Sequence, residues 1–210
     1  MADLKKHFED MLKDVYYAEK QIYKALPKMI KAASNEDLSA GFEKHREQTQ
    51  AQIERLERVF EMMDMPARGK KCPAIDGILE EGAELIEEHD RGAGLDAALA
   101  AAAQAVEHYE IARYGTLCSW CEALGMDDVK EILGETLDEE EATDETLSEL
   151  AIGTLNPAAV GGEGDDDEGD AAGARKGKPQ AAMKAKPADT SSKASSGMQP
   201  EPRSKAKAKA

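Results

Sequence analysis

Residues 99–121 read LAAAAQAVEHYEIARYGTLCSWC. Alanine and leucine dominate this stretch and favour a helix, and Val106 and Leu117 fall on one face of it at the helical period. Glu110 lies in the middle of that face, and Glu107 lies one turn earlier at its edge. Burying a carboxylate costs several kcal/mol unless the charge is compensated. The stretch therefore predicts a buried helix that carries a polar site.

Three other segments with a helical period have polar residues in the middle of an apolar stripe. Glu19 occupies the position that matches Glu110, and His45 occupies the position that matches Glu140. Two hairpins of the same pattern are therefore expected. The interrupted segments are residues 3–33 with Glu19, residues 37–64 with His45, and residues 127–153 with Glu140 and Asp144, beside residues 95–124 with Glu107 and Glu110.

Turn signals divide these segments into two antiparallel pairs. Ser34 and Asn35 separate the first two predicted helices, and Gly125 separates the last two. Between the pairs, glycines and prolines flank a shorter amphipathic helix predicted over residues 74–90. Two helical hairpins joined by a long crossover predict an all-α fold, a four-helix bundle of the ferritin-like kind with a short fifth helix.

Antiparallel packing brings the middles of all four long helices to one level of the bundle. We expect Glu19, His45, Glu110, Glu140 and Asp144 to converge there, with Glu107 beside them. Carboxylates gathered in a core repel one another, and two bound cations would balance them. Carboxylate and imidazole ligands suit iron, manganese or zinc, and of these we expect iron first. The sequence thus predicts a dinuclear metal centre with these six residues as ligands.

A buried salt-bridge network is the alternative interpretation of the same residues. Arg113 falls on the inward face of its predicted helix and would neutralise one or two of the acids. In that case His45 would be a hydrogen-bonded core histidine rather than a ligand. Four interruptions at one level favour the metal centre over this network.

The chain resembles the YciE/YciF family of ferritin-like proteins over residues 3–152. Within this match, the segment Val106-Glu-His-Tyr-Glu-Ile111 is the most specific. The matching stretches are Tyr17–Ile22, His45 with Thr49–Gln50, Lys71–Cys72, Ala101–Ala112 with Tyr114–Leu117, and Glu135–Glu140 with Ala142–Asp144.

This resemblance implies a ferritin-like bundle, a dinuclear metal centre and an association with bacterial stress responses. It assigns Glu19 to the role of the first-helix glutamate, and Glu107 and Glu110 to the third-helix pair. Ferritin-like iron sites usually carry Glu-x-x-His on the second and fourth helices, whereas this chain has His45-x-x-Gln48 and Glu140-x-x-Thr143. Asp144 is therefore expected to replace a histidine.

Composition limits the class of protein. The chain carries 27 Lys and Arg residues against 43 Asp and Glu, a net charge of −16. It contains no apolar run of about 18 residues and no apolar segment near the start, so we expect neither a membrane span nor a secretory signal. Three cysteines among 210 residues suit a reducing cytoplasm. Cys118 and Cys121 form a Cys-x-x-Cys inside a predicted helix, where small buried hydrophobes are the better interpretation.

Charge also divides the chain into two parts. Residues 1–156 carry a net charge of −18, and residues 157–210 carry +2. We predict the bundle over residues 1–156 and a disordered tail over residues 157–210, acidic at first and then rich in Lys, Ala and Pro. The basic part of the tail would contact nucleic acid through phosphates, or would act as a solvating appendage.

Two functions of different classes follow. The first is a metal-binding stress protein of the cytoplasm that oxidises its metal or reduces peroxide or oxygen, although the sequence does not establish that it is an enzyme. The second is a non-enzymatic structural or DNA-associated stress protein. We also expect a homodimer, because Met62, Met63 and Met65 offer apolar surface to a second copy.

Overall fold

The computed structural model describes residues 2–161, and the statements below concern this part of the chain. Most of the tail predicted as disordered and basic, residues 162–210, lies outside the described residues. The prediction that the tail contacts nucleic acid therefore also lies outside them.

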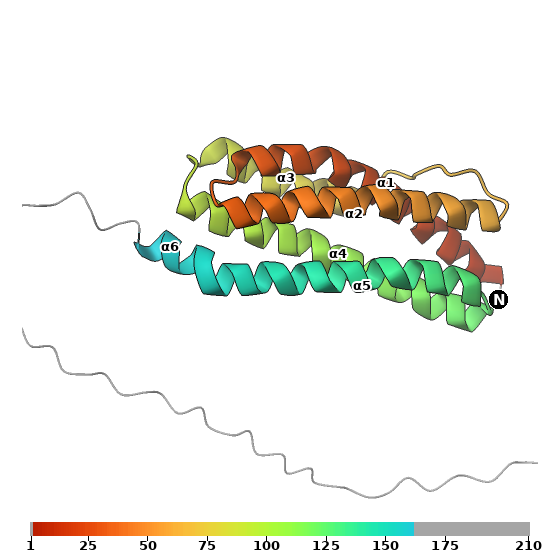
Figure 1. Ribbon diagram of the computed structural model, residues 1–210. Helices are drawn as coiled ribbons and strands as arrows, with labels where there is room; N and C mark the ends of the chain where they lie inside the picture. Colours follow the sequence, from red (N-terminus) through yellow and green to blue (C-terminus); the bar gives the residue numbers. More distant parts are fainter. Residues whose placement is uncertain (1, 162–210) are drawn as a thin grey trace, which may run out of the picture. The chain divides into compact units, whose positions relative to one another are not determined.

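Four long helices form the bundle, and the prediction of an all-α fold with one long crossover is confirmed (Figure 1). We call the first pair of helices the N-terminal hairpin and the second pair the C-terminal hairpin. The N-terminal hairpin consists of α1 (Ala2–Ala32) and α2 (Glu36–Met62), and the C-terminal hairpin consists of α4 (Ala93–Leu124) and α5 (Asp127–Leu150).

The crossover between the hairpins contains α3, Pro73–Glu88, as predicted. The loop of the crossover that precedes α3 packs closely on α1, because a Cβ atom added at Gly69 would lie 3.1 Å from the Cα atom of Tyr17. After α5 the chain forms a π-helical turn, Ala151–Leu155, and a short helix α6, Asn156–Gly161. Helical structure thus continues beyond residue 156, where the sequence analysis placed the start of the tail.

Polar groups at one end of the bundle connect the two hairpins. The side chain of Asn35 accepts a hydrogen bond from the amide of Leu38 at 2.9 Å and caps α2. The buried carboxylate of Asp96, in the first turn of α4, accepts the amides of Ser34 at 2.7 Å and Asn35 at 2.9 Å. The turn of the N-terminal hairpin is thereby fixed to the start of the C-terminal hairpin.

The apolar core has two halves. The half near the α1–α2 turn contains Leu26, Leu38, Phe42 and Leu99, and the other half contains residues such as Phe60. Between the halves, all four long helices contribute buried polar side chains, which we call the polar layer. The polar layer consists of Glu19, His45, Thr49, Gln52, Glu107, Glu110, Thr136 and Glu140.

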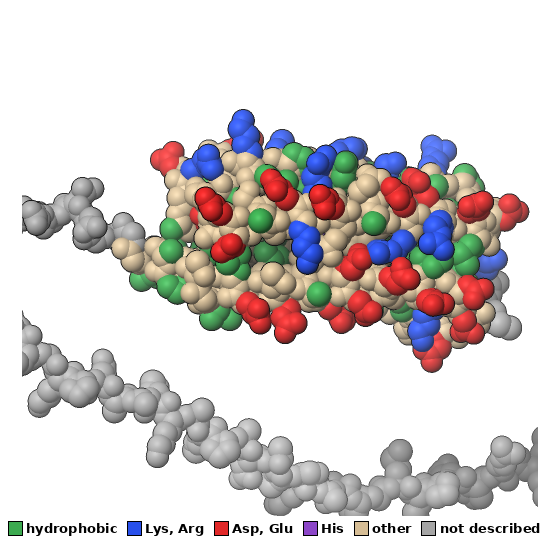
Figure 2. Space-filling view, in the orientation of Figure 1, with side chains coloured by type: hydrophobic (Ala, Val, Ile, Leu, Met, Phe, Trp, Pro, Cys, Tyr) green, Lys and Arg blue, Asp and Glu red, His purple; other side chains and the backbone are tan. Residues whose placement is uncertain are grey.

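The surface on the side of α2 and α5 carries acidic and basic side chains in mixture (Figure 2). Among the described helices, none combines the length and apolarity that crossing a membrane requires. Helices α2 and α5 lie side by side on this face, and hydrophobic side chains are recessed between them.

Candidate metal centre

The polar layer brings four predicted ligands together. His45 of α2, Glu107 and Glu110 of α4 and Glu140 of α5 each offer one ligand atom, and these atoms all lie within 4.8 Å of one another. All four side chains are buried. Their place in the apolar stripes explains the convergence, because each stripe faces the axis of the bundle. The hydrophobic effect on the neighbouring apolar residues carries these polar groups inward.

Glu19 joins this group from α1, the remaining long helix of the bundle. Its side chain is fully buried, and both Glu110 and Glu140 act on the pKa of its carboxyl. Burial raises the pKa of Glu19 well above its ordinary value, and the charge of Glu140 adds to the rise. The structure therefore places five of the six predicted ligands, all buried, within the polar layer.

Several ligand atoms in this group lack hydrogen-bond partners. Buried polar groups are normally paired, so unpaired atoms in one place call for an explanation. A cation held between them would supply the missing interaction, and the donor set fits iron, manganese or zinc. The unpaired atoms are Oε2 of Glu19, Glu107 and Glu140, both carboxylate oxygens of Glu110, and both ring nitrogens of His45.

Without a cation, burial shifts these carboxyl groups toward the protonated form. Burial raises the pKa of Glu110 well above its ordinary value, and the charge of Glu19 adds to the rise. Burial and a hydrogen bond with Glu140 do the same to the pKa of Glu107. Burial raises the pKa of Glu140 to about 7, while hydrogen bonds from Glu107 and Gln52 limit the rise. Cation binding would therefore release protons from these groups.

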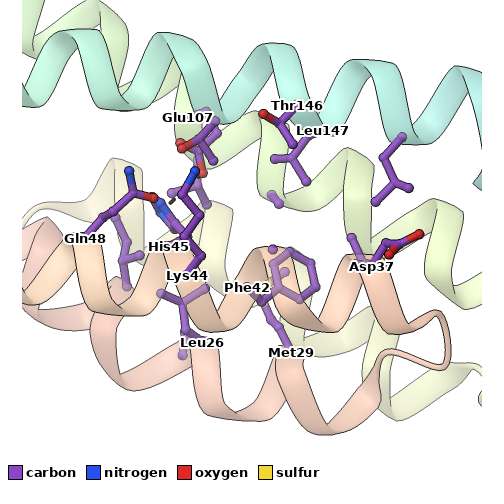
Figure 3. Close-up of a pocket in the computed structure, with 18 of the residues that line it drawn as sticks. Leu26, Met29, Asp37, Phe42, Lys44, His45, Gln48, Glu107, Thr146 and Leu147 are labelled. Atoms are coloured by element: carbon purple, nitrogen blue, oxygen red, sulfur yellow. Dashed lines mark ion pairs between the residues drawn. The ribbon is translucent and has the colours of Figure 1, made fainter.

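His45 is suited to act as a neutral nitrogen ligand. Burial lowers its pKa to about 4, so the imidazole is uncharged at neutral pH. Its Nε2 atom lies 3.4 Å from Oε1 of Glu107, and the two side chains point toward each other from α2 and α4 (Figure 3). An uncharged imidazole beside a carboxylate is the arrangement that transition metals bind.

Two residues that the sequence analysis missed orient the carboxylates of the polar layer, Gln52 from within the layer and Tyr114 from beside it. The hydroxyl of Tyr114 donates a hydrogen bond to Oε1 of Glu19, and Nε2 of Gln52 donates one to Oε1 of Glu140. Tyr114 follows Glu110 by four residues, and Gln52 follows His45 by seven. Both spacings keep a side chain on the same helix face, so this signal was present in the sequence.

The predicted role of Arg113 is wrong. Its guanidinium lies 5.1 Å from the centre of the Tyr109 ring rather than among the acids. Within residues 2–161, no lysine or arginine forms an ion pair with Glu19, Glu107, Glu110 or Glu140. Arg55 binds the neighbouring Glu139 instead, and its guanidinium donates to both oxygens of that carboxylate at 2.6 and 2.7 Å. A buried salt-bridge network therefore does not account for the polar layer.

Asp144 lies at the edge of the group. Its side chain is 22% exposed and accepts contacts from His108, at 3.2 Å from Nε2, and from Gln104, at 3.3 Å from Nε2. Its charge still reaches the site, because it contributes to the raised pKa of Glu107. The structure thus does not bring Asp144 into the four-residue group, since its carboxylate contacts Gln104 and His108 of α4 instead.

The cysteines lie away from the polar layer. Cys118 and Cys121 are free and buried inside α4, and burial raises the pKa of both thiols, that of Cys121 to about 12. A raised thiol pKa leaves little reactive thiolate. This agrees with the interpretation of both residues as small buried hydrophobes.

Known proteins share this fold and much of this sequence. Protein YciF of Escherichia coli (strain K12) is 46% identical over 160 residues, which cover 76% of this chain and 96% of that protein. The crystal structure of the E. coli stress protein YciF matches with a TM-score of 0.71 and 46% identity, over 74% of this chain and 99% of that chain.

Two further solved structures are similar. A Rhodopseudomonas palustris protein named YcfI, described as a candidate structural protein, has a TM-score of 0.68 and 51% identity, over 69% of this chain and 92% of that chain. A protein of Xanthomonas campestris pv. campestris has a TM-score of 0.61 at 21% identity, over 76% of this chain and 98% of that chain, and shares the fold. The resemblance to the YciE/YciF family is thereby confirmed. The sequence model of the family described as Domain of unknown function (DUF892) matches residues 3–160, so the chain belongs to this family.

Proposed function

We propose that the polar layer binds two metal ions and that the protein is a metal-binding stress protein. The observation that carries the proposal is the set of buried, unpaired ligand atoms contributed by His45, Glu107, Glu110 and Glu140. Glu19 completes the set from α1, and Asp144 is its outermost member. One divalent ion balances two carboxylates, so four buried carboxylates favour two ions over one.

Each kind of residue has its own role in metal binding. The carboxylates lose their protons and supply charge, with Glu19, Glu110 and Glu140 best suited to bridge two ions. His45 supplies an uncharged nitrogen. Tyr114 and Gln52 hold Glu19 and Glu140 in orientation, as the hydrogen-bond partners of metal ligands commonly do. Iron or manganese bound here would supply electrons for the reduction of peroxide or oxygen, and zinc would bind without redox chemistry.

A role in stress is supported by the related E. coli protein, which is described as a stress protein. A buried centre that binds iron and reduces peroxide or oxygen would be this protein's part in such a response, and the cytoplasm is where we place this activity.

The test is a titration of the metal-free protein with Fe(II) or Mn(II) in the absence of oxygen, with bound metal counted per chain. We expect two ions for the unchanged protein and the loss of at least one in Glu140→Gln, which keeps the shape of the side chain and removes its charge. The matched control is Glu141→Gln, an exposed neighbour in α5. Tight binding of less than one ion by the unchanged protein would refute the proposal.

A structural role is the second candidate, and the Rhodopseudomonas relative described as a candidate structural protein favours it. In this alternative the bundle is inert and the Lys-rich end of the chain contacts nucleic acid. A gel-shift assay compares the full chain with residues 1–161. Retardation by the full chain alone supports the alternative, and equal retardation or none removes the tail from consideration.

We also propose a homodimer, supported by apolar surface at the end of α2. Met62 is 48% exposed, and Met63 and Met65 lie beside it. Sedimentation of the unchanged protein and of Met62→Glu tests this. A dimer that the substitution weakens is expected, and a monomer in both samples contradicts it.

A further inference from the structure

A small cavity lies between α2 and α5, directly beside the polar layer. Its volume is about 60 Å³, and apolar side chains such as Leu26, Met29, Phe42 and Leu147 line it. His45 and Glu107 close one end, and Asp37 marks the other (Figure 3). In Figure 2 the same face shows hydrophobic side chains recessed between the two helices. The cavity therefore joins the surface to the His45 edge of the candidate metal centre.

Size and lining restrict what the cavity can hold. A cavity needs about 10–15 Å³ of such space to hold one water, so this one has room for a few water-sized groups. A buried water needs two to four polar partners, and most atoms around this space are apolar. Apolar cavities in proteins stay dry and bind apolar guests such as xenon. The cavity is too small for an organic ligand of ordinary size.

Charged and strongly hydrated molecules fit this space poorly. A metal ion in the apolar part would lose its hydration without gaining ligands until it reached His45 and Glu107. Hydrogen peroxide would leave its hydrogen-bonding groups unpaired over the same distance. A small apolar molecule has no such cost, because it makes no hydrogen bonds in water that the cavity must replace.

We propose that this cavity is a binding site for one small apolar molecule of the size of dioxygen, held beside His45 and Glu107. What such a molecule does there rests on the proposed metal centre, whereas its binding does not. The polar edge near Asp144 and Glu139 then remains for cations, so that gas and metal reach the polar layer from different sides.

Methyl-resolved NMR of the metal-free full-length protein tests the site under xenon pressure and under dissolved oxygen. We expect xenon to shift the methyl signals of Leu26, Met29 and Leu147, and paramagnetic oxygen to broaden the same signals. Leu117 and Leu133 are equally buried in the other half of the core and serve as internal references. Their signals are expected to change little.

A variant that fills the cavity provides the decisive comparison. Gly41 lines the cavity, and a Cβ atom built there meets no other atom within 4 Å. Gly41→Leu places a side chain in this space and favours the helix by up to about 1 kcal/mol, so the variant is expected to fold. Gly134→Leu in α5 is the matched control, because Gly134 also has open space and lies outside the cavity.

The expected result is loss of the xenon and oxygen effects in Gly41→Leu and their retention in Gly134→Leu. Equal effects on both halves of the core, no effect on the cavity methyls, or contacts of these methyls with long-lived water would each overturn the proposal. Metal counting on the same two variants separates it from the proposed function. A cavity that binds xenon in a chain that binds no metal leaves this inference standing, and the reverse result removes it alone.

Discussion

The two hairpins carry one pattern of buried positions but different chemistry at those positions. In the N-terminal hairpin, Glu19 and His45 supply one carboxylate and one neutral imidazole. In the C-terminal hairpin, Glu107, Glu110 and Glu140 supply three carboxylates. Matching geometry therefore does not mean matching charge, and most of the negative charge enters the polar layer from one side.

The hairpins differ most at the last polar position of the second helix in each pair, which is Thr49 in α2 and Asp144 in α5. Thr49 is fully buried, and its hydroxyl donates to the backbone carbonyl of His45 at 2.8 Å, so its own helix satisfies it. The corresponding Asp144 reaches the surface and pairs with His108. The N-terminal hairpin thus closes the polar layer, whereas the C-terminal hairpin opens it toward solvent.

The largest expected effect is the pH dependence of stability in the metal-free protein. Burial raises the pKa of Glu140 from 4.5 to about 7, so the folded state holds a proton that the unfolded state has lost between these values. Stability therefore falls as the pH rises through this window, by about 3 kcal/mol for Glu140 alone. Glu19, Glu107 and Glu110, whose pKa values are also raised, extend the fall toward higher pH.

His45 acts in the opposite direction. Its pKa is lowered from 6.5 to about 4, so stability is lost as the pH falls through that range. The two effects oppose each other up to pH 6.5, and above it only the carboxyl groups act. Urea unfolding at a series of pH values, with a chelator present, measures the sum. A stability that is constant or rises between pH 6.5 and 8 would show that the carboxyls are not buried together.

The second effect compares one carboxylate from each hairpin. At pH 8 without metal, Glu110→Gln is expected to raise the free energy of unfolding by about 2 kcal/mol, because the folded state no longer has to hold a proton on a buried carboxyl that the unfolded chain ionises. Glu19→Gln is expected to gain less, since the hydrogen bond from Tyr114 limits the rise in the pKa of Glu19. With metal present the sign of the effect reverses, because Glu110→Gln is expected to weaken metal binding by more than about 100-fold.

Urea unfolding with chelator and then with Mn(II) measures both signs on the same samples. Destabilisation of the metal-free protein by Glu110→Gln would show that the carboxylate has a structural partner instead. Equal gains from the two substitutions would show that the hydrogen bond from Tyr114 contributes nothing.

Sequence periodicity predicted the fold and the core of the candidate site for a physical reason. A charged residue inside an apolar stripe, such as Glu110, is carried inward by its neighbours, so its position follows from the helical period alone. Residues at the edge of a stripe have no such constraint. Arg113 could turn away to stack on Tyr109, and Asp144 could turn to solvent, because long or small polar side chains at an edge have another place to go. Hydrogen bonds between helices, as from Gln52 to Glu140, require coordinates.

The third effect concerns the support of a carboxylate across the two hairpins. Gln52 donates from α2 to both Glu139 and Glu140 of α5. Gln52→Leu keeps a side chain of similar size and removes the donor, so metal affinity is expected to fall about tenfold. Gln50→Leu is the control, because Gln50 is exposed in the same helix and bonds only to Glu54. Equal affinities of the two variants for Mn(II), measured by titration, would contradict the role of Gln52.

The smallest effect is expected at the open edge of the C-terminal hairpin. Asp144→Asn keeps the shape of the side chain and its contact with Gln104, and it removes a charge that lies near Glu107 without entering the four-residue group. Metal affinity is therefore expected to fall by less than about tenfold, below the loss from Gln52→Leu. A loss equal to that of Glu110→Gln would show that Asp144 turns inward when metal binds. In that case the two hairpins would differ at this position in the ligand they supply, with Asp144 coordinating metal where Thr49 bonds only to its own backbone.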